Sequence, residues 1–170
     1  MEVLEVNSTT SSQASWPIVV GPVALGLALG FGSGVRAMLS RGLLLPALVV
    51  GLTVALTPAL YIGLSLSGAA PPARDVARAI GESLCSAGLV MIGLAPATLF
   101  LVASTRSSGV IEALGTVVIG GAALLGMRRL SQLLFANQLV TFRPVAVYAG
   151  WAIVALSLGS KLLARFGGLS

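Results

Sequence analysis

The chain has 170 residues, of which 56% are hydrophobic and 9% are charged, and its mean hydropathy is +1.02. A soluble domain carries about 25% charged residues, so this chain has too few polar groups to cover a globular surface in water. It has no His and a single Cys, Cys85, which excludes an intrachain disulfide and removes the most common general base of enzymes. The composition predicts a membrane protein.

The apolar runs are continuous rather than alternating, which favours membrane-spanning helices over a transmembrane barrel. We therefore expect an all-α, polytopic transmembrane helix bundle in a single domain over residues 17–166, between a mobile polar tail at 1–16 and a short tail at 167–170. The five expected spans cover residues 17–35, 42–66, 83–105, 109–127 and 144–160.

The tail at 1–16 lacks Lys and Arg, which a signal peptide needs ahead of its apolar stretch. The first span is barely long enough to cross, because residues 18–35 give about 27 Å of helix against a hydrocarbon core of about 30 Å. Five of these eighteen residues are Gly and one is Pro22. The segment is therefore a tilted span or a re-entrant piece, and the re-entrant alternative leaves four spans.

The second span, 42–66, is the strongest candidate and contains Pro46 and Pro58. Each proline removes a backbone donor, so we expect a bend near each one, with the hydroxyl of Thr53 or Thr57 satisfying a freed carbonyl.

The segment that follows, PPARDVARAIGE, predicts a separate interfacial helix. It holds Arg74, Asp75, Arg78 and Glu82, where Asp75 and Arg78 are spaced i,i+3 and Arg78 and Glu82 are spaced i,i+4, so both pairs can form ion pairs. This patch is a candidate docking surface, and the alternative is an ordinary solvated helix face.

The later spans are punctuated by arginine. The span 83–105 contains Pro96, and 109–127 is closed by Arg128 and Arg129. The next thirteen residues, LSQLLFANQLVTF, are too short to cross and either extend the preceding helix or lie along the surface. Lys and Arg divide five against five between the two sides, so charge leaves the orientation open; the first helix favours an outside N-terminus. Because the cations are scattered in this way, no nucleic-acid partner is expected.

Gly26, Gly30 and Gly34 form a GxxxGxxxG pattern. Small residues four apart share a helix face and allow a close helix approach, so this is a candidate oligomer or partner face. Packing within the same chain is the alternative.

Glu112 is the one acid that could lie at membrane depth, where it would be a candidate for ion coupling. Its place in the first turn of a predicted helix, after Ser107, Ser108 and Gly109, also suits a carboxylate in the headgroup region.

The stretch from GSGVRAMLSRGLLLPALVVGLTVALTPALYIGLSL through IGLAPATLFLVAST resembles small bacterial polytopic inner-membrane proteins with a layout similar to the Yip family. The resemblance covers about 75 residues and implies a bacterial inner membrane, with no catalytic or ligand residue to transfer.

The motifs of metalloproteases, α/β-hydrolases and P-loop proteins are absent, and no cofactor or metal is expected. We therefore expect a non-enzymatic accessory or scaffold subunit whose partners are the bilayer and other membrane subunits or further copies of itself. The alternative is a small oligomeric transporter or pore, with Glu112 or the proline-containing spans lining a path. A lipid-modifying enzyme is a remote third option.

Overall fold

The computed structural model describes residues 15–68, 71–105, 107–135 and 142–167. These segments form five α-helices and one short 3₁₀ turn, and five helical segments are long and apolar enough to cross a membrane. The elements in chain order are α1 Trp16–Gly30, η1 Phe31–Ser33, α2 Val35–Leu66, α3 Ala73–Ser104, α4 Ser108–Phe135 and α5 Phe142–Gly167. The expected all-α bundle is confirmed, and the chain is a multi-pass membrane protein. Most of the two expected tails, 1–14 and 168–170, lies outside the described residues.

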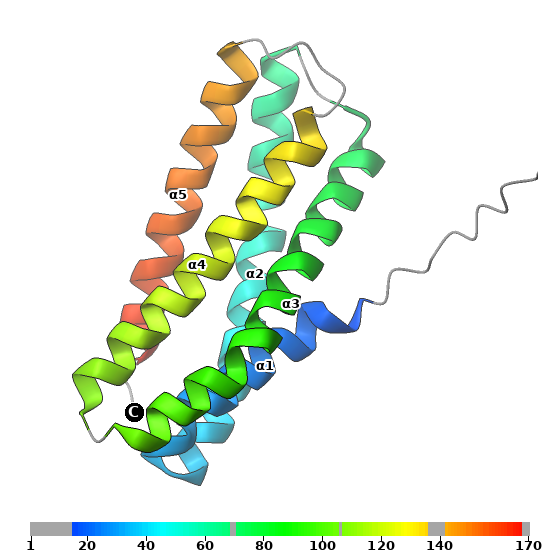
Figure 1. Ribbon diagram of the computed structural model, residues 1–170. Helices are drawn as coiled ribbons and strands as arrows, with labels where there is room; N and C mark the ends of the chain where they lie inside the picture. The colour runs from blue at the N-terminus through cyan, green and yellow to red at the C-terminus, as the bar shows by residue number, and fades with distance from the viewer. Residues whose placement is uncertain (1–14, 69–70, 106, 136–141, 168–170) are drawn as a thin grey trace, which may run out of the picture.

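Helix α1 is about half the length of its neighbours, since its 15 residues extend about 22 Å while the 32 residues of α2 extend about 48 Å. It lies in one half of the bundle, where it packs against both α2 and α3 (Figure 1). Its start at Pro17 contacts Gly88, near the middle of α3. The short first helix therefore fills the space between α2 and α3 in that half.

The turn between α1 and α2 ends at Gly34, whose φ of +95° lies in a region that side chains with a Cβ rarely adopt. The first span consequently ends at Ser33, where η1 continues α1 beyond Gly30, rather than at residue 35, where the sequence placed the end of the span. Gly34 is the N-cap of α2 and does not continue the helical face of Gly26 and Gly30.

Two hydrophobic clusters fill the bundle. One joins α1, α2, α3 and α4 in the half of the bundle that contains α1, and the other joins α2, α3, α4 and α5 in the opposite half. The first includes Leu25, Leu29, Leu45, Met91, Val102, Val118 and Ala122; the second includes Leu60, Leu64, Val76, Ala79, Ile80, Leu130, Leu134 and Tyr148. Each cluster depends on four helices.

Three sequence expectations about boundaries are corrected or resolved. The charged segment after Pro72 is no separate interfacial helix, because it forms the first three turns of α3, with Val76 and Ile80 buried in the cluster that joins α2, α3, α4 and α5. The LSQLLF part of the short segment extends α4 to Phe135, which is one of the two alternatives; residues 136–141 lie outside the described part of the chain. The last helix, α5, is also longer than its apolar run.

The threonines of α2 bond differently from the expectation. Thr53 Oγ1 donates to the carbonyl of Val49 and Thr57 Oγ1 donates to the carbonyl of Thr53, both at 2.7 Å. These are the carbonyls four residues earlier on the same helix, whereas Pro58 frees the carbonyl of Val54. The hydroxyls therefore reinforce intact turns rather than the turn that the proline interrupts.

Candidate functional site

The glycines of α1 lie at two helix crossings within the chain. A Cβ added to Gly26 would lie 2.8 Å from the carbonyl carbon of Arg41, and one added to Gly30 would lie 2.8 Å from the nitrogen of Met38, both in α2. The candidate oligomer face is thus occupied by α2 of the same chain. Such close contact requires glycine, because any Cβ would meet backbone.

Arg41 connects the same two helices through its side chain. Its Nη1 donates a hydrogen bond of 3.1 Å to the carbonyl of Leu29, in the last turn of α1. A cation beside the final carbonyls of a helix is favourable, because those carbonyls carry partial negative charge and lack helical partners. This guanidinium therefore stabilises the α1–α2 hairpin.

Sequence reasoning missed the crossing of α1 with α3. A Cβ on Gly21 would lie 2.6 Å from the Cα of Gly88, and a Cβ on Gly88 would lie 2.7 Å from the carbonyl carbon of Pro17. The signal was present as two glycines in apolar segments, but nothing in their spacing shows that residues so far apart in the chain meet. On the neighbouring face of α3, a Cβ added to Gly126 of α4 would lie 3.2 Å from the Cβ of Ala87, so α4 also approaches α3 closely.

Helix α5 is attached by two aromatic side chains that donate to carbonyls of neighbouring helices. The hydroxyl of Tyr148 donates to Met127 in α4, and Trp151 Nε1 donates to Leu56 in α2 at 2.9 Å. The Tyr148 and Trp151 rings lie with centroids 6.0 Å apart. These polar tips find partners inside an apolar bundle, which orients α5.

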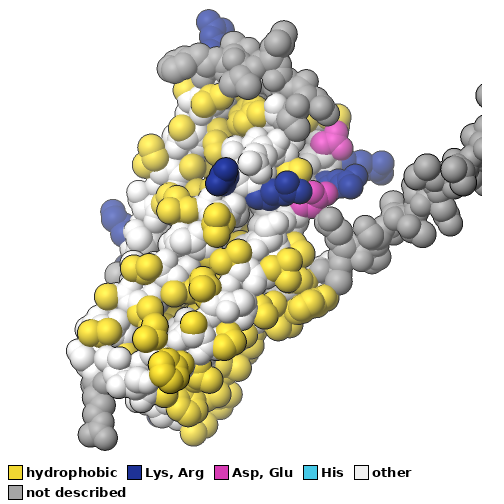
Figure 2. Space-filling view, viewed as in Figure 1, with side chains coloured by type: hydrophobic (Ala, Val, Ile, Leu, Met, Phe, Trp, Pro, Cys, Tyr) yellow, Lys and Arg dark blue, Asp and Glu magenta, His cyan; other side chains and the backbone are white. Residues whose placement is uncertain are grey.

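The charged patch on α3 is partly paired. Arg78 Nε lies 2.9 Å from Glu82 Oε1, while the described residues show no ion pair between Asp75 and Arg78. The Arg78 side chain is 80% exposed, so this pair resembles the solvated helix face that was the alternative to a docking surface. Figure 2 shows charged side chains of both signs gathered toward the end of the bundle where α3 begins.

The position of Arg74 fits the same description, since it is exposed in the first turn of α3. Gly126 packs against Ser83, so Arg128 and Arg129 of α4 lie at the same end as Glu82. The four residues of the patch balance in charge, and Arg128 and Arg129 give this end of the bundle an excess of cations.

Glu112 is exposed in the second turn of α4, outside both hydrophobic clusters. Its backbone carbonyl accepts a hydrogen bond from Thr116 Oγ1 at 2.9 Å. An ion-coupling carboxylate is expected to face a bundle interior or a water-filled cavity, and this one faces outward in the single chain.

The described interior offers little for chemistry. Its buried polar side chains are Ser83 and Thr98, and both hydroxyls donate to carbonyls of their own helix, Ile80 and Leu94. In the described segments no three His, Cys, Asp or Glu side chains come together as a metal site. Nothing in these segments assembles an acid, a base and a nucleophile.

Comparisons with models of protein families, with curated proteins and with solved structures find no match to this chain. The similarity to the Yip-family layout therefore stays a prediction from the residues.

Proposed function

We propose that the protein is a non-enzymatic accessory or scaffold subunit of a larger membrane assembly, which it binds through the outer faces of α2 and α5. The observation that carries this proposal is the unequal covering of the helices. In the most apolar window, 44% of the residues of the first span are buried within the chain, whereas the shares are 11% in α2 and 6% in α5.

Bilayer lipid can cover such faces, but packing gives a reason to expect protein there. Helices associate in lipid where small residues let backbones approach. The outward face of α2 carries Ala47, Gly51, Ala55 and Ala59 at intervals of four, all exposed. The face therefore has the small-residue spacing that the α1 glycines already use within the chain.

The polarity of the interior argues against a solitary transporter. A conducting path needs polar or charged groups that converge on one line through the membrane. The two buried hydroxyls of the described bundle are bonded to their own helices, and Glu112 faces outward. The described part of a single chain supplies no such line.

The test is site-specific photocrosslinking of the full chain in its native membrane. A photoreactive residue at Val54 or Ile153, which are 67% and 65% exposed on α2 and α5, should crosslink to one discrete membrane protein. The matched control is Phe100 on α3, which is 70% exposed and should give crosslinks to lipid only.

Two outcomes would refute the proposal. One is that all three positions crosslink to protein equally, or that none of them does. In either case, recovery of this chain alone as a monomer in mild detergent would support the refutation. The other is flux of an ion or solute through liposomes that contain the purified chain, lost in Glu112→Gln, which would establish the transporter instead.

A further inference from the structure

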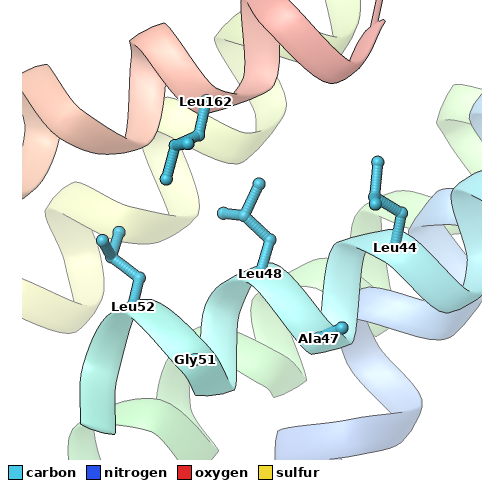
Figure 3. A pocket seen from close by; sticks show the side chains of 6 residues that line it. All are labelled: Leu44, Ala47, Leu48, Gly51, Leu52 and Leu162. Atoms are coloured by element: carbon cyan, nitrogen blue, oxygen red, sulfur yellow. The ribbon is translucent and has the colours of Figure 1, made fainter. Parts of the chain in front are cut away.

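An apolar groove lies between α2 and α5. It has a volume of about 310 Å³ and is lined by Leu44, Ala47, Leu48, Gly51, Leu52 and Leu162. Figure 3 shows three leucines of α2 and Leu162 of α5 facing each other across it. We call it the α2–α5 groove, and its size is at the lower end of the range of about 300–1,000 Å³ for ligand pockets.

Small residues create the space in this groove. Ala47 and Gly51 fall between the leucines of α2, and a Cβ added to Gly51 would meet no atom within 4 Å. Helices α2 and α5 come back into contact at Gly159, where an added Cβ would lie 3.5 Å from Leu52 Cδ2. The groove is therefore bounded at one end, and the other end points toward the N-terminus of α2 and the C-terminus of α5.

The open end of the groove lies where the uncharged segments of α2 and α5 give way to charged residues. Leu162 directly follows Lys161, the first charged residue of α5 after Arg143, and Arg165 lies one helical turn beyond Lys161. Both cations are exposed. The groove thus runs from the hydrocarbon region to a plane of cations.

Helix α2 extends the cationic end on its own side. The i,i+4 row through Leu48 and Leu44 continues to Ser40 and then to Arg36, both exposed. Among the described acids only Glu112 lies at this end of the bundle, and it belongs to α4, which does not line the groove. The local charge is therefore positive.

We propose that the α2–α5 groove binds one acyl chain of an anionic phospholipid, whose phosphate is held by Lys161, Arg165 and Arg36. Basic residues that flank an apolar cleft between helices suit such a headgroup by charge complementarity. The apolar lining suits the chain, because all six residues that form it lack ionisable groups. The proposal does not rest on the scaffold function: the groove shares Ala47 and Gly51 with the small-residue row of α2, but Ala55 and Ala59 lie outside the groove and stay open to a partner helix when a lipid occupies it.

The dimensions distinguish a lipid chain from a partner helix. From Leu44 to Leu52 the groove follows eight residues of α2, or about 12 Å. A helix segment of that length with a diameter of about 10 Å occupies about 900 Å³. The groove offers about 570 Å³ even when the open space at its mouth is included, so a helix from a second copy would rest on its rim, whereas a single acyl chain is slender enough to lie along its floor.

The test is native mass spectrometry of the full chain, purified in a nonionic detergent and stripped of lipid. Titration with phosphatidylglycerol should give one tightly bound molecule, and phosphatidylcholine with the same acyl chains should bind at least about tenfold more weakly. The double variant Lys161→Gln/Arg165→Gln should weaken phosphatidylglycerol about 25-fold, which is about fivefold for each lost cation near the surface. The double variant Arg128→Gln/Arg129→Gln, at the other end of the bundle, should leave binding unchanged.

A second pair of variants tests the groove itself. Gly51→Leu should reduce the affinity for phosphatidylglycerol at least about tenfold by filling the space, whereas Gly121→Leu on α4, which also has open space beyond its Cα, should not. Helix content by circular dichroism shows that each variant folds, and the cation variants decide the question if Gly51→Leu does not fold. Equal binding of the two lipids, or unchanged binding in both test variants, overturns the proposal. A dimer that Gly51→Leu dissociates would also overturn it and assign the groove to a second copy.

Discussion

The glycine crossing of α1 and α3 gives the sharpest prediction for stability. In Gly88→Ala the new Cβ would lie 2.7 Å from the carbonyl carbon of Pro17, while ordinary van der Waals contact begins at 3.4 Å. The difference, 3.4 minus 2.7, requires the two helices to separate by at least 0.7 Å at this point. The obstacle is backbone on both sides, so no side-chain rotation can relieve it.

The energetic cost follows from the cluster below the crossing. A gap of about 0.5–1 Å removes about a quarter to a half of each dispersion contact, and Leu25, Leu29, Met91 and Val102 pack across this interface. Overpacking of this kind costs about 1–3 kcal/mol, and the rigid backbone contact favours the upper end. We therefore expect the free energy of unfolding to fall by about 3 kcal/mol relative to the control.

The control is Gly93→Ala on the same helix, where an added Cβ meets nothing within 4 Å. Both substitutions gain the same helix propensity, about 1 kcal/mol, so their difference isolates the packing term. Unfolding by sodium dodecyl sulfate in mixed micelles, followed by tryptophan fluorescence, measures the difference in the free energy of unfolding. Trp16 at the start of α1 reports on the affected helix. Equal stability of the two variants would show that α1 does not cross α3 at Gly88.

Three further predictions concern single contacts. Gly34→Ala should lower the free energy of unfolding by about 1–2 kcal/mol in the same assay, because a φ of +95° strains any residue with a Cβ; a neutral effect would place the α1–α2 turn in another conformation. Tyr148→Phe should cost about 0.6 kcal/mol, the average for hydrogen bonds between membrane helices, and should leave the carbonyl of Met127 with its helical hydrogen bond alone, which isotope-edited infrared spectroscopy detects as a shift of its amide I band. An unshifted band would mean that α5 is held in another way. Arg78→Gln should lower the free energy of unfolding by less than about 1 kcal/mol, since the Arg78 side chain of the pair is 80% exposed although that of Glu82 is only 16% exposed; a loss above about 2 kcal/mol would mean that the Arg78 side chain packs against something else.

Local chemistry predicted the class of the protein and most helix positions. The composition and the continuous apolar runs require helices in a membrane, because backbone groups in hydrocarbon must bond within their own segment. The i,i+4 pair of Arg78 and Glu82 also followed from spacing along one helix. Helix ends were predicted less well, because the limits of the apolar runs in α3 and α5 do not mark where charged segments continue the same helix.

The sequence by itself determined that this chain crosses a membrane as helices and that it has few groups for chemistry. Only the tertiary structure decided which glycines meet, as at Gly21 and Gly88, and that Gly26 and Gly30 are used inside the chain rather than on an oligomer face. It also decided that α2 and α5 are the least covered helices and that a groove opens between them. The reason is that spacing fixes which residues share one helix face, whereas the neighbour of that face depends on how distant helices pack.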